Sequence, residues 1–225
     1  MILTFTGRLI DPFKLEPKDI SIRDIAHALS MTCRWGGHTS RFYSVAEHCV
    51  RLVEFADTSN EASPFLGSLD LKKLLLLHDA SEAYLTDVPS PYKARPEFAA
   101  FVAFEHEVQR VIDAHFDLER LKRYSPLNAA VKRLDVAILG NEAAELLPLE
   151  RLNISLPAPL REAPNVLWRE HRHGPAKWKF DGPSGSDMMA TPTRVVTDNS
   201  PWGWTPEQAE AIFLDQYTRL FGDTE

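Results

Sequence analysis

An all-α, mainly helical fold with a small N-terminal strand or hairpin element is the fold class that the sequence predicts. Several stretches place apolar residues at the three- and four-residue spacing of a helix face. Three of these stretches begin with Ser or Thr followed three residues later by an acidic or amide side chain, as in a helix capping box. Prolines and glycines separate the stretches. The chain has 225 residues, enough for one domain with a real core, so we expect a single domain over residues 1–225.

The elements follow in chain order. The first ten residues mix β-branched and polar side chains, which favours a strand or hairpin. We expect helices at about 21–33, 44–56, 70–84, 98–116, 127–147 and 205–221. The capping pairs are Ser21 with Asp24, Ser44 with Glu47, and Thr205 with Gln208. Three prolines exclude a helix interior between 87 and 96. Residues 155–205 are rich in Pro and Gly without a sustained period, which predicts an irregular excursion, either a functional flap or a partly mobile segment.

The composition argues against some classes of function and leaves others open. The formal net charge is −7, which argues mildly against a nucleic-acid binder with a basic face. A small anionic substrate stays open, because a pocket needs only a few local cations. The two cysteines form no disulfide framework. No secretory signal or apolar stretch of membrane-spanning length is present, so we expect a cytoplasmic protein without a membrane partner. Phosphate-binding glycine motifs of the P-loop or Rossmann type are also missing.

Four side chains are the strongest candidates for chemistry: His48, His78, Asp79 and Asp135. The pair His78-Asp79 alone means little, because a histidine after a leucine run is more often a core residue. His48 and Asp135, however, also border apolar helix faces, where an ionised carboxylate is costly unless it is paired or binds a metal. Two imidazoles and two carboxylates pointing inward from three helices are typical of a metal site in a bundle. We therefore expect one divalent ion, which could be Mn, Co, Zn, Fe, Ni or Mg.

The order His48, His78-Asp79, Asp135 resembles the H…HD…D signature of the HD phosphohydrolase superfamily. The similarity extends over residues 24–48, which include Arg34, Trp35 and His38, and over residues 78–93, from the HD pair to Lys93. Two branches are similar: bacterial HD-type 5′-deoxynucleotidases and phage HD-type dATP triphosphohydrolases. The resemblance covers roughly residues 1–150 and 201–222, and it implies an HD-domain helical bundle.

The resemblance also implies roles for matching residues. Glu82, Asp79 and Asp87 would be catalytic, with Glu82 orienting or deprotonating the attacking water and Asp87 facing the sugar or leaving group. Arg34 and Lys93 would bind phosphate, and Trp35 would lie near the nucleoside. His38 is a further candidate for substrate binding, although a surface position is nearly as compatible with its place in the sequence. Arg34 and Lys93 could also be solvated charges, and Trp35 could belong to the core.

The expected activity is metal-dependent hydrolysis of a deoxynucleotide, with dATP to deoxyadenosine plus triphosphate as first choice. The alternatives are a 5′-deoxynucleotidase acting on dNMPs and a nucleotide-binding HD protein without catalysis. We expect a small-molecule nucleotide as partner, no nucleic acid, and a homo-oligomer. His106 and His115 are nine residues apart on one expected helix, so they point in opposite directions and a single metal is favoured. His27 is expected in the core, and His171 and His173 in a surface loop.

Overall fold

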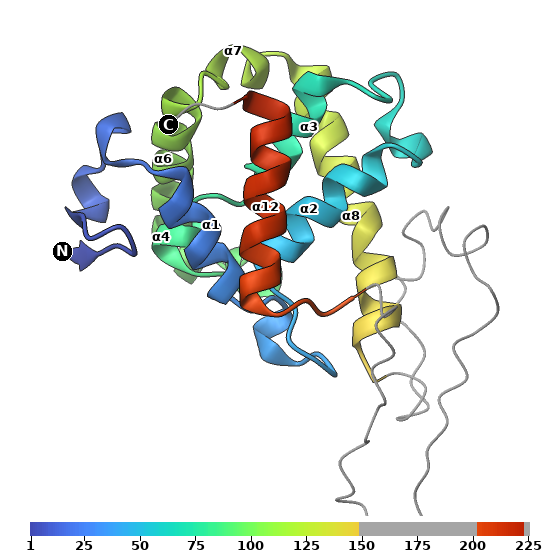
Figure 1. Ribbon diagram of the computed structural model, residues 1–225, viewed down its shortest axis with the longest axis horizontal. Coiled ribbons are helices and arrows are strands. Elements are labelled where there is room, and N and C mark those ends of the chain that lie inside the picture. Colours follow the sequence, from blue (N-terminus) through green and yellow to red (C-terminus); the bar gives the residue numbers. More distant parts are fainter. Residues whose placement is uncertain (149–201, 223–225) are drawn as a thin grey trace, which may run out of the picture.

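The computed structural model describes residues 1–148 and 202–222, and within them the chain is mainly helical (Figure 1). Two short strands pair antiparallel at the N-terminus, β1 (Ile2–Leu3) and β2 (Leu9–Ile10). The longer helices are α1 (Ile22–Met31), α2 (Val45–Ala56), α3 (Leu69–Leu76), α6 (Ala99–His115), α8 (Ser125–Leu146) and α12 (Pro206–Phe221). Single helical turns form α4 (Glu82–Leu85), α5 (Ser90–Lys93) and α7 (Glu119–Lys122). The expected helical fold with a small hairpin is therefore confirmed.

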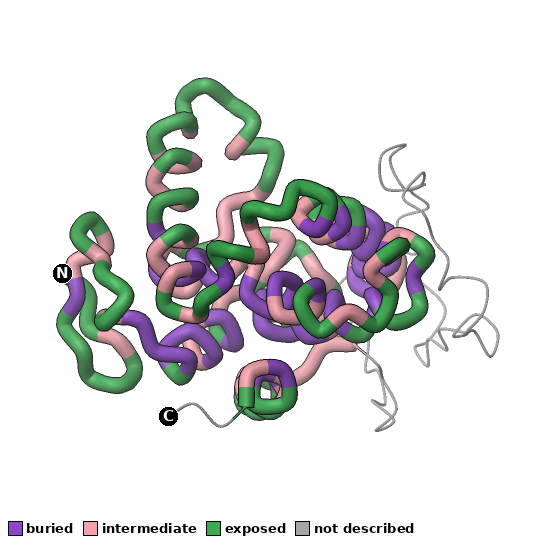
Figure 2. Tube along the Cα trace, turned by 90° about the horizontal axis from the view of Figure 1, so that it is seen from above, coloured by how far each residue is buried: buried purple, intermediate pink, exposed green. Residues whose placement is uncertain are grey.

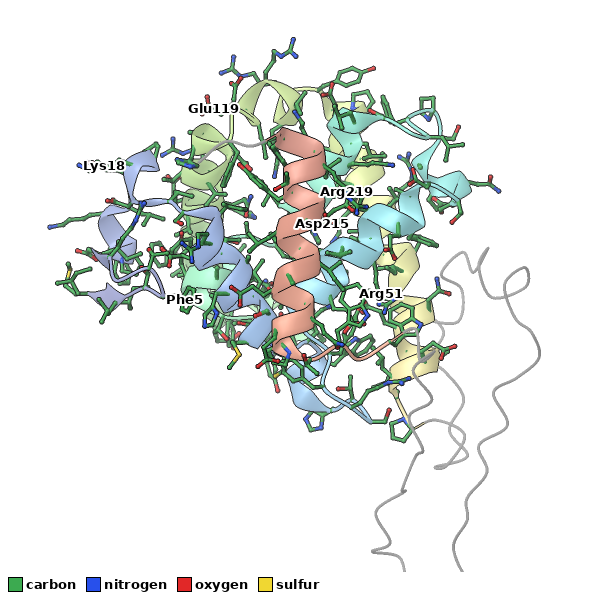
Figure 3. All side chains as sticks on the ribbon, viewed as in Figure 1. Phe5, Lys18, Arg51, Glu119, Asp215 and Arg219 are labelled. Atoms are coloured by element: carbon green, nitrogen blue, oxygen red, sulfur yellow. The ribbon has the colours of Figure 1, made fainter. Side chains whose placement is uncertain are left out.

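The helix α2 lies at the centre of the arrangement. It packs against α1, α3, α8 and α12, and ten of its twelve residues are buried. In Figure 1 the C-terminal helix α12 crosses in front of α2, and it also packs on α1 and α3. Figure 2 shows α12 with one buried side toward the body and an exposed side outward. On that outward side, Arg219 and Asp215 form an exposed ion pair (Figure 3).

Local capping explains several helix starts. The Ser44 hydroxyl accepts the Glu47 backbone N–H at 3.0 Å, and Thr205 with Gln208 forms the complete expected capping box. The predicted cap at Ser21 is wrong, since Ser21 makes no side-chain cap bond. Its proposed partner Asp24 instead accepts the backbone N–H and the hydroxyl of Thr6, at 2.7 and 2.8 Å. Asp24 therefore fastens the N-terminal hairpin to α1.

The expected continuous helix over 70–84 is interrupted. α3 ends at Leu76, α4 begins at Glu82, and the residues between form tight turns. In the Pro-rich stretch, residues 90–93 form one helical turn with Pro91 in its first positions, where the missing N–H costs nothing. The expected excursion at 155–205 falls almost wholly outside the described residues. None of the helices in the described ranges is long and apolar enough to cross a membrane.

Candidate metal centre

Four side chains from three parts of the chain meet in one cluster. His48 comes from α2, His78 and Asp79 from the turn after α3, and Asp135 from α8. The two Nε2 atoms of His48 and His78 are 3.3 Å apart. Asp79 Oδ2 lies 3.1 Å from His78 Nε2 and 3.8 Å from His48 Nε2, and Asp135 Oδ1 lies 3.9 and 3.6 Å from the same two atoms. The chain therefore brings together the four side chains that the sequence singled out.

Both imidazole rings are oriented through their other nitrogen. His48 Nδ1 lies 2.5 Å from the Glu142 carboxylate, and His78 Nδ1 lies 2.8 Å from the Leu75 carbonyl oxygen. A carboxylate or a carbonyl next to Nδ1 requires that nitrogen to carry the proton. The two Nε2 atoms then face each other and the two carboxylates. This is the arrangement of histidines that bind a metal through Nε2.

The donor set fits a divalent cation. Two ligand atoms about 2.1 Å from one ion and at right angles to each other are about 3.0 Å apart, close to the shortest contacts in this cluster. Without a cation, the two Nε2 atoms can be joined only by a proton held between them, and a metal ion can take the place of that proton. Mixed nitrogen and oxygen ligation suits a transition-metal ion. The cluster could therefore hold a metal through His48, His78, Asp79 and Asp135.

Charge interactions within the cluster favour a cation as well. Burial alone would lower the pKa of His78, but the Asp79 carboxylate outweighs it and raises that pKa well above its usual range. Burial would raise the pKa of Asp79, but His78 and Arg34 reverse this and hold it far below its usual range. Each residue thus keeps its charged form because of the other. A site that stabilises a positive charge on His78 this strongly can stabilise a metal ion in the same place.

A second possible set of metal donors shares His78 and Asp79 with the four side chains above. Cys49, His78 and Asp79 are also close enough to share an ion. Burial raises the pKa of the Cys49 thiol, so it stays protonated and is a poor ligand. Its Sγ lies 3.9 Å from Nδ1 of His78, the nitrogen that already bonds the Leu75 carbonyl. The set with His48 and Asp135 is therefore the better metal site.

The interruption of the helix after Leu76 is what presents His78 and Asp79. Gln109 of α6 holds this turn open: its amide N–H bonds the Leu77 carbonyl at 2.9 Å, and its amide oxygen accepts the Ser81 N–H at 3.1 Å. The Ser81 N–H has no other partner among the described residues, so leaving it unpaired would cost about 1–3 kcal/mol, whereas the Leu77 carbonyl also accepts the Ala80 N–H at 3.2 Å. The expected continuous helix over 70–84, on which His78 and Glu82 would share one face, is therefore wrong at this point. Glu82 begins the separate helix α4.

The carboxylates mark the open side of the cluster. The side chain of His48 is fully buried, whereas those of Asp79 and Asp135 are 23% and 20% exposed. Lys132, itself exposed, lies with its Nζ 3.1 Å from Asp135 Oδ2 at this side. A ligand from solvent would therefore approach past Asp79 and Asp135.

Arg34 and Trp35 lie beside the cluster. Arg34 Nη1 is 3.2 Å from Asp79 Oδ2, and Trp35 Nε1 donates to Glu142 at 3.0 Å. Burial would lower the pKa of Arg34, but Glu142 and Asp79 raise it, so the guanidinium is charged. Trp35 has a left-handed backbone with φ of 57°, as do the next two glycines. A non-glycine residue holds this conformation only where its surroundings enforce it.

The expected catalytic carboxylates form a second group next to Asp79. Glu82 is buried, and its Oε2 has no hydrogen-bond partner among the described residues. Burial, followed by Asp79 and Asp87, raises the pKa of Glu82 to about 9. Burial also raises the pKa of Asp87. Lys93 Nζ lies 2.6 Å from Glu105 and 3.5 Å from Glu82, so it is an ion-paired lysine rather than a solvated one.

The remaining candidates lie away from the four ligands. His38 is exposed at the end of the short turn after Trp35. His106 and His115 are both exposed on α6, and neither belongs to a group of described side chains that could share an ion. His27, expected in the core, is instead one-third exposed and pairs with Glu210 of α12 at 2.9 Å. His171 and His173 lie outside the described residues.

Two residues that hold the cluster were missed by the sequence argument. Glu142 follows Asp135 by seven residues, which places both on one face of α8, so helical spacing contained a signal for it. Its two oxygens contact His48 and Trp35. Gln109 has no such signal, because its role depends on how α6 packs against the turn after α3.

Comparisons with known proteins find two relatives whose sequences match nearly two thirds of the chain. No protein-family model matches the chain. It is 34% identical over 151 residues to the uncharacterized protein YfdR of Escherichia coli (strain K12), covering 64% of this chain and 71% of that protein. It is 32% identical over 143 residues to the uncharacterized protein RCAP_rcc00048 of Rhodobacter capsulatus, covering 63% and 70%. The chain therefore belongs to the family of the uncharacterized proteins YfdR and RCAP_rcc00048.

Proposed function

We propose that this protein is a metal-dependent phosphohydrolase of the HD type that acts on deoxynucleotides. One observation carries the proposal: two histidines with Nδ1 engaged turn their Nε2 atoms toward each other, and two part-exposed carboxylates complete the set. His48, His78, Asp79 and Asp135 would hold one divalent ion. When bound, the ion would supply Lewis-acid stabilisation of charge on the phosphoryl group.

The neighbouring residues suit hydrolysis of a phosphate ester. The Arg34 guanidinium, beside Asp79, offers a planar pair of donors to phosphate oxygens. Glu82 would accept the proton of the attacking water. Its pKa of about 9 belongs to the cluster without a cation, and a divalent cation next to Asp79 would favour the ionised form that a base requires.

The bond changes are those of a simple ester hydrolysis. A water oxygen forms the new bond to phosphorus, its proton goes to Glu82, and the bond from phosphorus to O5′ breaks. The leaving O5′ then takes a proton, and Asp87, whose pKa is raised by burial, is the candidate to face it. Trp35, whose Nε1 contacts the same Glu142 oxygen as Arg34, is a surface on which a nucleobase could stack.

The first candidate substrate is dATP, with deoxyadenosine and triphosphate as products. This choice rests on the resemblance of residues 24–48 and 78–93 to the phage enzymes. A specific observation favours the second candidate, a deoxynucleoside monophosphate. Lys93 is already paired with Glu105 and Glu82, and this makes it less available to the additional phosphate groups of a triphosphate.

Turnover of a nucleotide panel tests the proposal. The protein, loaded in turn with Mn(II), Co(II) and Mg(II), would be incubated with dNMPs, dNTPs and ribonucleotides, and the phosphate product identified by phosphorus NMR. Triphosphate from dATP supports the first candidate, and orthophosphate from dAMP with no release from dATP supports the second. Metal-loaded protein that binds nucleotides but turns over none of the panel would contradict the proposal and leave a nucleotide-binding role.

A further inference from the structure

Glu142 joins the metal cluster to the residues expected to hold the nucleotide. Its carboxylate is fully buried on α8. One oxygen, Oε1, contacts His48 Nδ1 at 2.5 Å and accepts the Tyr43 hydroxyl at 2.9 Å. The other, Oε2, accepts Trp35 Nε1–H at 3.0 Å and lies 3.7 Å from Arg34 Nη2. One side chain thus contacts a metal ligand on one side and the Arg34-Trp35 pair on the other.

We propose that Glu142 is a positioning residue for both metal binding and nucleotide binding. One of its oxygens orients the metal ligand His48, and the other orients the Arg34-Trp35 pair. The part of the inference that concerns nucleotide binding rests on the proposed function. The part that concerns metal binding depends only on the four side chains of the cluster.

The contacts require a carboxylate rather than a polar side chain of the same shape. All four groups around Glu142 are donors, and a carboxylate accepts on both oxygens. A glutamine has one acceptor and one donor end. If its NH₂ group faces Trp35 and Arg34, donors oppose donors. If it faces His48, Nδ1 must lose its proton to accept, the proton moves to Nε2, and His48 can no longer bind a metal through that atom.

The Trp35 contact has a second consequence. Trp35 has a φ of 57°, and Gly36 and Gly37 that follow are also left-handed. The hydrogen bond from Nε1 to Glu142 is the described interaction that holds the Trp35 side chain in place. Losing the acceptor would release this strained turn and the adjacent Arg34. Nucleotide affinity should therefore fall even when the metal site is full.

The experiment compares Glu142→Gln with Glu47→Gln. Glu47 is an equally buried carboxylate on α2, but it bonds Arg51 and the backbone N–H groups of Gly203 and Trp204, none of which belongs to the cluster (Arg51 is labelled in Figure 3). Metal affinity is measured by electron paramagnetic resonance titration with Mn(II) alone. The histidine tautomers are read from long-range proton–nitrogen NMR spectra of the metal-free protein. Neither readout depends on turnover.

We expect Glu142→Gln to weaken Mn(II) binding by about 10- to 100-fold, the usual effect of losing the partner of a ligating histidine. The His48 ring signals should change in the same variant, and the KM for the hydrolysed nucleotide should rise at saturating Mn(II). Glu47→Gln should lower the unfolding temperature but leave Mn(II) affinity unchanged. Trp35→Phe removes the Nε1 donor together with part of the aromatic surface, so it should raise KM and leave Mn(II) affinity unchanged.

Glu142→Asp keeps both acceptor oxygens on a side chain one methylene shorter, and it should retain more Mn(II) affinity than Glu142→Gln. This variant also tests the inference if the glutamine variant fails to fold. Wild-type Mn(II) affinity in Glu142→Gln, or an equal loss in Glu47→Gln, would overturn the positioning role. If no nucleotide is hydrolysed but the Mn(II) affinities and histidine tautomers change as expected, the proposed function fails. The part of the inference that concerns metal binding then stands.

Discussion

Replacing Gln109 by leucine removes the carboxamide that holds the turn between α3 and α4 open. In the wild type this group bonds the Leu77 carbonyl and the Ser81 N–H, and both residues are buried. Leucine has a similar size but no polar atoms, so the Ser81 N–H loses its described partner, while the Leu77 carbonyl keeps the Ala80 N–H at 3.2 Å. At about 1–3 kcal/mol for one buried unsatisfied group, the free energy of unfolding should fall by about 1–3 kcal/mol.

The measurement is urea unfolding of the protein in the presence of a chelator, followed by circular dichroism. Arg110→Ala on the same helix is the control, because Arg110 forms only an exposed pair with Glu107 and should change stability by less than about 0.5 kcal/mol. Gln109→Glu keeps an acceptor for Ser81, but it places a carboxylate against the Leu77 carbonyl and against Asp113, whose Oδ1 accepts the Gln109 amide at 2.9 Å, so it should not restore stability. Mn(II) affinity should fall with stability, because the same turn presents His78 and Asp79. A leucine variant as stable as the control would refute the role of Gln109.

Three further predictions concern the cluster itself. Asp79→Ala should abolish stoichiometric metal binding, measured by elemental analysis after dialysis, and with it the gain in thermal stability that bound metal gives; unchanged metal content would contradict the ligand assignment. Glu82→Gln should keep the metal but lower kcat by about 10²- to 10⁴-fold, the usual contribution of a general base; near-normal turnover in metal-loaded protein would remove Glu82 from the mechanism. Burial would raise the pKa of Glu142, but Arg34 and His48 hold it at about 2, below its ordinary value of 4.5. Its contribution to stability should be complete above pH 4.5 and lost as the pH falls toward about 2. In chelator, the stability difference between wild type and Glu142→Gln should therefore shrink on acidification, and a constant difference would count against this.

Periodicity and capping were enough to predict most helices. Apolar spacing placed α1, α2, α6, α8 and α12 within a few residues of their ends, and the Thr205-Gln208 capping box was correct in detail. The break after Leu76 could not be predicted this way. The sequence from 70 to 84 has good helical spacing, but a tertiary contact from Gln109 stabilises the interrupted form. Local propensity is a weak guide where distant residues supply the backbone partners.

The residues of the site were likewise predictable only where their signal is local in the sequence. The four side chains of the cluster were predictable from the resemblance of their order to the HD signature, and His48 and Asp135 also from their places on expected helices. Glu142 also lies on such a face, two turns after Asp135, but a fully buried glutamate is recognisable as functional only when its partners are known. Those partners, Tyr43, His48 and Trp35, come from a segment about a hundred residues away in sequence. Their convergence depends on α2 packing against α8, which a single sequence does not reveal.

The most direct test of the metal centre is anomalous X-ray diffraction from crystals of the protein grown with Mn(II). One anomalous peak is expected per chain, within bonding distance of Nε2 of His48, Nε2 of His78 and one oxygen each of Asp79 and Asp135. The same position should be empty in crystals of Asp79→Ala grown in the same way. A wild-type map without a peak between these four side chains, or with the only peak elsewhere on the protein, would contradict the account.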